Sequence, residues 1–89
     1  MKAIVTVIGM DRVGITAEVC TLLAQHNINI LDISQTVLQG YFTMVMLVDT
    51  AACTASIGEM SDILAKAGEE QGLSIRIQRE DIFNAMHRI

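Results

Sequence analysis

The residues best suited to chemistry lie in one short loop near the N-terminus, at residues 9–14 (GMDRVG). Asp11 is placed to be the N-cap of a following helix, because its carboxylate can accept the free N–H groups of the first helical turn. Gly14 would then lie in that turn, where a residue without a side chain lets another group approach the N–H donors. The helix dipole there favours an anion. The loop therefore predicts either an anion site or a plain helix cap with close packing at Gly14, and both interpretations stay open.

Few other residues form a chemical constellation. His26 and His87 lie far apart in the chain, with no carboxylate or cysteine at ligand spacing, so no metal site is predicted. Cys20 and Cys53 are too few for a disulfide framework, and we expect two reduced thiols in or near the core. No nucleophile stands beside a base, and no pair of carboxylates is spaced to meet in a cleft. We therefore expect a protein that is not an enzyme and has no cofactor.

Length and composition predict one small domain with more apolar side chain than it can bury alone. Of the 89 residues, 52% are hydrophobic, but these include only one Tyr, two Phe and no Trp. A folded monomer of 9.7 kDa hides only about 64% of the surface of its unfolded chain. The excess predicts burial against a partner, most simply a second copy of the chain.

The same numbers argue against several classes of protein. A net charge of −4 with six Lys and Arg residues does not suit a nucleic-acid binder, which needs positive charge along the phosphate backbone. No apolar run reaches the roughly 18 residues of a membrane span. The N-terminal residues alternate like a first strand and do not resemble a signal peptide. We therefore expect a cytoplasmic protein.

Hydrophobic periodicity predicts an alternation of strands and helices. Gln39-Gly40 is typical of a hairpin turn, and Ser56 and Glu59 have the spacing of a capping box. The order β-α-β-β-α-β is that of the ferredoxin-like split βαβ arrangement, a four-stranded antiparallel sheet with two helices on one face. The predicted strands cover residues 2–8, 28–38, 41–48 and 73–79; the predicted helices cover 15–26 and 56–71, with a short amphipathic helix at 80–89.

The predicted sheet is apolar on both faces. The strand at residues 41–48 places apolar side chains on each side, so the face away from the two helices also needs a cover. The helix at 80–89 could cover it, within its own chain or across to a second chain, and a dimer contact is the other candidate. The possible interface residues are Gln35, Phe42, Met44, Met46, Ile82, Phe83 and Met86.

Three segments make a more specific pattern, and through them the chain resembles the ACT domain family. They are Asp11-Arg12-Val13-Gly14-Ile15 after an apolar strand, His26-Asn27-Ile28-Asn29-Ile30 at the end of the first helix, and Asp32-Ile33-Ser34-Gln35 on the second strand. The likeness is greatest with small stand-alone bacterial proteins and with the domains of the glycine cleavage system's transcriptional repressor. It implies an ACT-like domain at residues 1–79, with residues 80–89 as part of the same domain.

The resemblance also implies a binding site. In amino-acid-binding ACT domains the ligand lies at a dimer interface, between the strand-to-helix loop of one subunit and the start of the second strand of the other. The corresponding positions are Asp11, Arg12 and Gly14 on the loop and Asn29 on the strand. The frequent proline of the family is Val13 here, and an acid at position 11 repels a ligand carboxylate unless the ligand's amino group faces it.

The chemistry of these residues suits a zwitterion. Asp11 and the carbonyl of Asn29 can accept from an ammonium group, while Arg12, the Gly14 N–H and the Asn29 amide can donate to a carboxylate. Arg12 is alternatively a solvated loop cation or a partner of Glu18. We therefore expect a homodimeric regulatory module that binds a small molecule, which the family resemblance implies is an amino acid, and that acts on any regulated protein in trans. The alternative is a dimerisation module that regulates a partner without a ligand.

Overall fold

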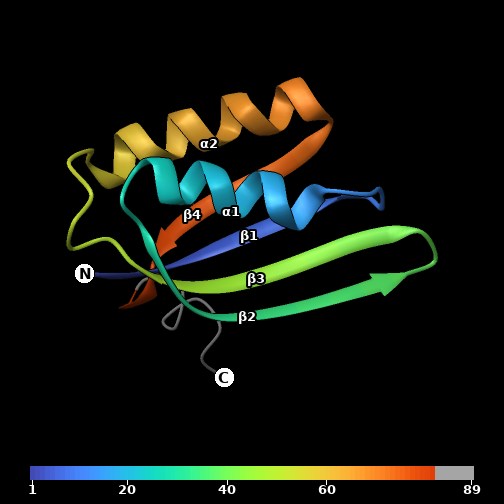
Figure 1. Ribbon diagram of the computed structural model, residues 1–89, viewed down its shortest axis with the longest axis horizontal. Coiled ribbons are helices and arrows are strands. Elements are labelled where there is room, and N and C mark those ends of the chain that lie inside the picture. Colours follow the sequence, from blue (N-terminus) through green and yellow to red (C-terminus); the bar gives the residue numbers. More distant parts are fainter. Residues whose placement is uncertain (82–89) are drawn as a thin grey trace.

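The structure is a computed structural model that describes residues 1–81. Its order of elements confirms the predicted ferredoxin-like fold: an antiparallel sheet in the spatial order β2-β3-β1-β4, with α1 and α2 side by side on one face (Figure 1). The predicted helix at residues 80–89 lies outside the described residues from 82 onward. The elements are β1 (Lys2–Met10), α1 (Ile15–Gln25), β2 (Asn29–Leu38), β3 (Tyr41–Asp49), α2 (Ile57–Gln71) and β4 (Leu73–Arg79).

Local signals in the sequence set most element boundaries. The Ser56 hydroxyl accepts from the Glu59 N–H and the Glu59 carboxylate accepts from the Ser56 N–H, both at 3.1 Å, which completes the predicted capping box of α2. Gln39 and Gly40 both have positive φ, at 51° and 84°, as a tight hairpin turn requires. Gly72 ends α2 in the left-handed conformation. These contacts join neighbours in sequence, so sequence pattern alone could predict them.

The start of α1 differs from the prediction. Gly14, with φ of 93°, is the N-cap, and no side chain caps the helix. The predicted cap at Asp11 is wrong, and Gly14 precedes the first turn instead of lying in it. Gly14 adopts a left-handed backbone conformation, which residues with a Cβ rarely adopt. The helix cap therefore lies three residues later than the predicted cap at Asp11. The first N–H groups of α1 are therefore left without a side-chain acceptor.

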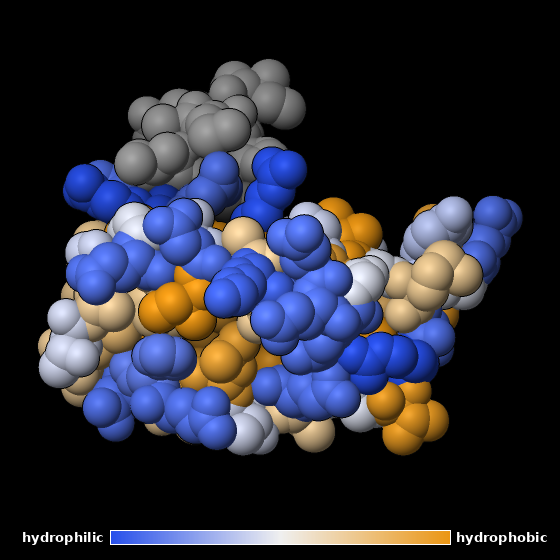
Figure 2. Space-filling model, turned by 90° about the horizontal axis from the view of Figure 1, so that it is seen from above, coloured by the Kyte–Doolittle hydropathy of each residue, from blue (hydrophilic) through white to orange (hydrophobic). Residues whose placement is uncertain are grey.

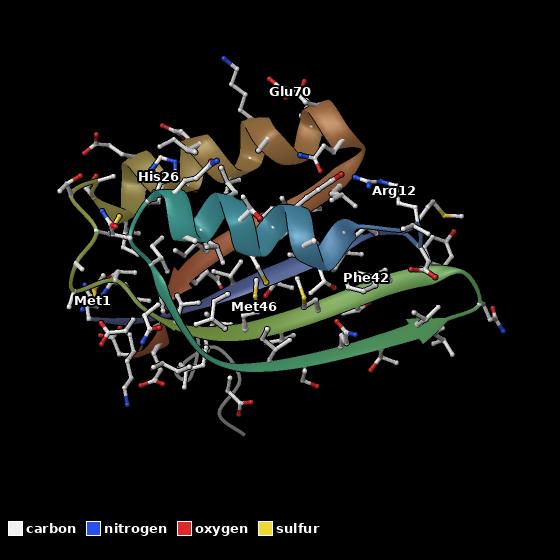
Figure 3. The ribbon with its side chains drawn as sticks, in the orientation of Figure 1. Met1, Arg12, His26, Phe42, Met46 and Glu70 are labelled. Atoms are coloured by element: carbon white, nitrogen blue, oxygen red, sulfur yellow. The ribbon has the colours of Figure 1, made fainter. Side chains whose placement is uncertain are left out.

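Three of the predicted interface residues belong to the core. Phe42, Met44 and Met46 are at most 5% exposed, and Figure 3 shows Phe42 and Met46 between the sheet and the helices. Since these side chains are covered within one chain, their prediction as interface residues is wrong. Both faces of β3 are apolar, so alternation alone did not reveal which face the helices cover. Cys20 and Cys53 are half-buried and pack against this core, as expected.

The outer strand β2 extends beyond the cover of the helices. Its residues Ile33 and Val37 pair with core residues of β3 and so face the helix side, yet they are 40% and 54% exposed. The register of β2 and β3 shifts between Ile30 and Asp32, which makes Leu31 the extra residue of a bulge. In Figure 2 the β2–β3 hairpin projects as an arm from the main body. This leaves β2 as a long exposed edge.

The face of the sheet away from the helices, here called the open face, has two parts. Its near half, beside the start of β1, contains Ile4, Val45 and Leu47, which are all half-buried. Its far half lies toward the hairpin and is strongly exposed. The apolar residues of the far half are Ile8, Met10, Leu38 and Tyr41, at 47%, 62%, 70% and 57% exposure.

Candidate functional site

The loop between β1 and α1 is tied to the hairpin. The Asp11 N–H donates to the Gly40 carbonyl at 2.8 Å, and Met10 pairs with Tyr41 at the same end of the sheet. The Asp11 side chain is exposed, so its carboxylate is accessible from solvent. The loop therefore has a defined position beside the end of β2.

Arg12 is held by a carboxylate of its own chain. Its Nη2 donates to Glu18 Oε2 at 2.8 Å and to Gln71 Oε1 at 3.1 Å, and its Nη1 lies 3.3 Å from Glu18 Oε1. This fork raises the pKa of Arg12 and lowers the pKa of Glu18, chiefly through the hydrogen bond between the two side chains. The structure thus confirms the alternative in which Arg12 pairs with Glu18, and Arg12 bridges the loop to α1 and to the end of α2.

We expect the variant Glu18→Gln to be less sensitive to acid than the native chain. Because the folded pKa of Glu18 is lowered, its pairing stabilises the fold above the ordinary glutamate pKa of about 4.3 and is lost as pH falls through the lower, folded value. Gln does not titrate, so the Tm of this variant should fall less steeply between about pH 6 and pH 3. Thermal unfolding at several pH values measures the slope.

The control for that comparison is Glu69→Gln, which changes an exposed glutamate of α2. Its Tm should follow the native pH dependence more closely than that of the Glu18 variant. Added salt should also reduce the difference between Glu18→Gln and the native chain, since exposed ion pairs are screened. Equal slopes for all three proteins would contradict a role for the Arg12 pair.

Asn29 begins β2 at the opposite end of the sheet. It is exposed and pairs with Asp49 of β3. The Asp49 carboxylate accepts from the Ala51 N–H at 2.9 Å and lies 3.5 Å from the N-terminal ammonium of Met1. The Ala51 hydrogen bond, followed by the ammonium, lowers the pKa of Asp49. Asn29 therefore stands beside a carboxylate that stays ionised.

The two halves of the predicted site are far apart in one chain. Met10 pairs with Tyr41 at the loop end of β3, whereas Lys2 pairs with Asp49 at the other end, and eight residues of strand span about 27 Å. In Figure 3, Arg12 lies at one end of the molecule and Met1 and His26 at the other. A ligand the size of an amino acid cannot contact both Asp11 and Asn29 of the same chain.

Sequence reasoning missed two residues of this region. Gln71 accepts a hydrogen bond from Arg12, 59 positions away in the sequence. The Met1 ammonium forms an ion pair with Asp49, at the end of β3. No local pattern predicts either contact, since each depends on how distant elements pack. Gln35, predicted at an interface, accepts from the Thr16 hydroxyl at 3.1 Å and is exposed; Ile82, Phe83 and Met86 lie outside the described residues.

Residues 1–81 contain neither a cluster of metal-ligating side chains nor a membrane-spanning helix. No three His, Cys, Asp or Glu side chains in this range come together in a way that could hold a metal ion. Nor does this range contain a helix long and apolar enough to cross a membrane.

Comparisons with known proteins agree on the relatives of this chain. A family model described as an ACT domain matches residues 2–78, which include the whole loop and Asn29. A UPF0237 protein of Bifidobacterium longum is 56% identical over 88 residues, covering 99% of this chain and 98% of the relative. The solved ACT domain protein from Streptococcus pneumoniae is 40% identical, with a TM-score of 0.84 and 98% of both chains covered. A solved putative glycine cleavage system transcriptional repressor is 27% identical, with a TM-score of 0.73 over 86% of this chain and 44% of its own.

Proposed function

This chain belongs to the ACT domain family, a family of regulatory modules for small molecules and often amino acids, and we propose that it binds a small amino acid or a related carboxylate as a homodimer. The observation that carries the proposal is the separation of Asp11 and Asn29 by the length of the sheet. A site that uses both residues therefore needs the loop of one copy and the second strand of another.

The exposed edge of β2 suggests how two copies meet. If two β2 edges lie antiparallel across a two-fold axis, the start of β2 in one copy lies beside the end of β2 in the other. The end of β2 leads into the hairpin, whose Gly40 carbonyl holds the Asp11 N–H. Such a dimer brings Asn29 of one copy to the loop of the second, with about two strand spacings, roughly 10 Å, for a ligand.

The groups at this junction match a zwitterion. The Asp11 carboxylate and the Asn29 carbonyl accept from an ammonium group. The first N–H groups of α1, with no side-chain cap at Gly14, favour a carboxylate together with the helix dipole. Arg12 has its charge already satisfied by Glu18, so we assign it to holding the loop, and we assign carboxylate binding to the backbone.

A thermal-shift panel of the twenty amino acids tests the proposal. A ligand that binds only the folded dimer stabilises it by about 2.7 kcal/mol at a hundred times its Kd, which should raise the Tm of a domain of this size by roughly 10–20 °C. We expect one or a few amino acids to give such a shift. Asn29→Ala should abolish it, whereas Ser74→Ala, an exposed residue on the other edge strand, should not.

A second function remains in competition, because the far half of the open face favours a protein partner. Ile8, Met10, Leu38 and Tyr41 form an exposed apolar surface beside the loop, and such surfaces mark protein contacts. A module of that kind would regulate a partner without a small ligand. A flat amino-acid panel, unchanged by Asn29→Ala, would contradict ligand sensing and favour this function.

A further inference from the structure

The second edge of the sheet runs along β4, which pairs only with β1 among the strands of residues 1–81. An edge strand presents a row of backbone N–H and C=O groups that can pair with another extended chain, and proteins often blunt such an edge with a proline or a bulge. This chain contains no proline, and the register of β4 on β1 is continuous from Leu73 to Arg79. Residues 73–77 of β4 therefore form a regular edge that suits an added strand.

A hollow of about 390 Å³ lies along this edge, between β4 and α2. Figure 2 views the molecule from the side of α2 and β4, and shows hydrophobic side chains there with hydrophilic ones on either side. An added strand would thus place part of its surface against apolar groups. The hollow is lined by the apolar residues Ala65, Leu73 and Ile75 and by the polar residues Glu69, Ser74 and Arg76.

The alternation of side chains along β4 defines the chemistry of such a strand. Ile75 pairs with the core residue Val7 and is only 3% exposed, whereas Arg76 pairs with Thr6 on the open face and is exposed. Arg76 forms no ion pair with another of residues 1–81. Cross-strand neighbours of like polarity or opposite charge stabilise a sheet. The edge therefore favours a strand in which an apolar residue lies beside Ile75 and an acidic residue beside Arg76.

The start of this edge is held in place by α2. A Cβ on Gly68 would lie 2.5 Å from the Leu73 carbonyl oxygen, so the backbones of α2 and β4 are in direct contact there. Leu73 and Ile75 are both buried. An edge that is ordered before its partner arrives loses less conformational entropy on binding.

A second copy of this chain is a poor occupant of the β4 edge. The proposed dimer joins two chains through their β2 edges, and the choice of occupant rests on that proposed function. If β4 edges also paired with each other, every dimer would join a further dimer on each side, and the sheet would extend without closing. A closed assembly leaves the β4 edge to a different protein.

From these observations we infer that residues 73–77 of β4 bind an extended segment of a partner protein by strand addition, with an apolar residue of the partner beside Ile75 and an acidic residue beside Arg76. The β4 edge and the β2 edge lie at opposite sides of the sheet. The partner and a second copy can therefore bind at the same time, which gives a regulatory module a direct contact with the protein that it regulates.

Titration of the ¹⁵N-labelled full-length protein with a model peptide tests this contact. The peptide acetyl-KVTVEVTVK-amide has the same sequence in both directions, so it can pair in parallel or antiparallel. We expect the amide resonances of residues 73–77 to shift and those of β2 to stay unchanged. Shifts along β2 alone, or no shifts at millimolar peptide, would each overturn the inference. Chains of protein copies that the peptide disperses in sedimentation would assign the edge to a second copy and overturn it too.

An exchange of charge gives a second readout. The affinity of this peptide, relative to that of acetyl-KVTVKVTVK-amide, should fall about tenfold from the native chain to Arg76→Glu, because like charges oppose cross-strand pairing. The matched control Lys66→Glu makes the same charge change on an exposed residue of α2 outside the hollow, and should keep the native ratio at about 0.15 M salt. An unchanged ratio in Arg76→Glu would contradict the inference, whether or not any amino acid binds.

Discussion

Mixing the variants Asp11→Ala and Asn29→Ala should restore amino-acid binding that neither variant shows alone. In the proposed homodimer, either variant alone carries one altered half in both of its sites. Random exchange makes half of the dimers mixed, and a mixed dimer has one site with both halves native and one with both altered. About a quarter of all sites should therefore bind. Titration calorimetry with an amino acid identified by the thermal-shift panel measures this fraction.

The control for this experiment is a mixture of Asp11→Ala with the double variant Asp11→Ala/Asn29→Ala. No pairing of those two chains provides a native loop, so no binding should return. If the Asp11→Ala and Asn29→Ala mixture stays inactive after subunit exchange is demonstrated, the site is not shared between copies in the way that the opposite ends of the sheet suggest.

The largest change in stability is expected from Gly68→Ala, in the last turn of α2. A Cβ at this position would lie 2.5 Å from the Leu73 carbonyl oxygen and 3.2 Å from a side-chain carbon of Ile75. The carbonyl belongs to β4, which follows α2 after the single residue Gly72, so α2 cannot move away freely. We expect a loss of about 2 kcal/mol from overpacking, even after the gain in helix propensity of about 1 kcal/mol.

Gly58→Ala is the matched control in the same helix. Its Cβ would meet nothing closer than the Ser56 hydroxyl, at 3.9 Å, so it should gain stability by about 0.5–1 kcal/mol. Urea unfolding of both variants, compared at equal slopes, measures the difference of roughly 3 kcal/mol. Equal free energies of unfolding for the two variants would show that α2 and β4 are not packed backbone against backbone.

The sequence was sufficient for the elements because their signals are local. The capping box of Ser56 and Glu59, the hairpin turn at Gln39-Gly40 and the alternation of β4 all appear in the structure as predicted. Each depends on residues within a few positions of one another. The exception is the start of α1. Asp11 is of a residue type that favours the N-cap position, but Gly14, with its left-handed backbone, is the N-cap.

The candidate site depended on contacts that sequence does not contain. From its type and spacing, Arg12 could contact a ligand, solvent or Glu18. Only the folded structure shows that it pairs with Glu18 and also donates to Gln71 at the end of α2. Likewise, the resemblance supplied Asp11 and Asn29 as partners in binding, but only the register of β1, β2 and β3 places them at opposite ends of one chain.

By itself, the sequence determined a small βαββαβ domain with an apolar excess, since composition and strand periodicity are properties of the chain alone, and its motifs carried the resemblance to the ACT domain family. Only the tertiary structure decided where the excess lies. Phe42, Met44 and Met46 are buried under the helices, and the surplus remains on the open face and along β2. The physical reason is that, when a strand is apolar on both faces, either face could be the one that the helices cover. The choice is made when two helices, far apart in sequence, pack on the same side.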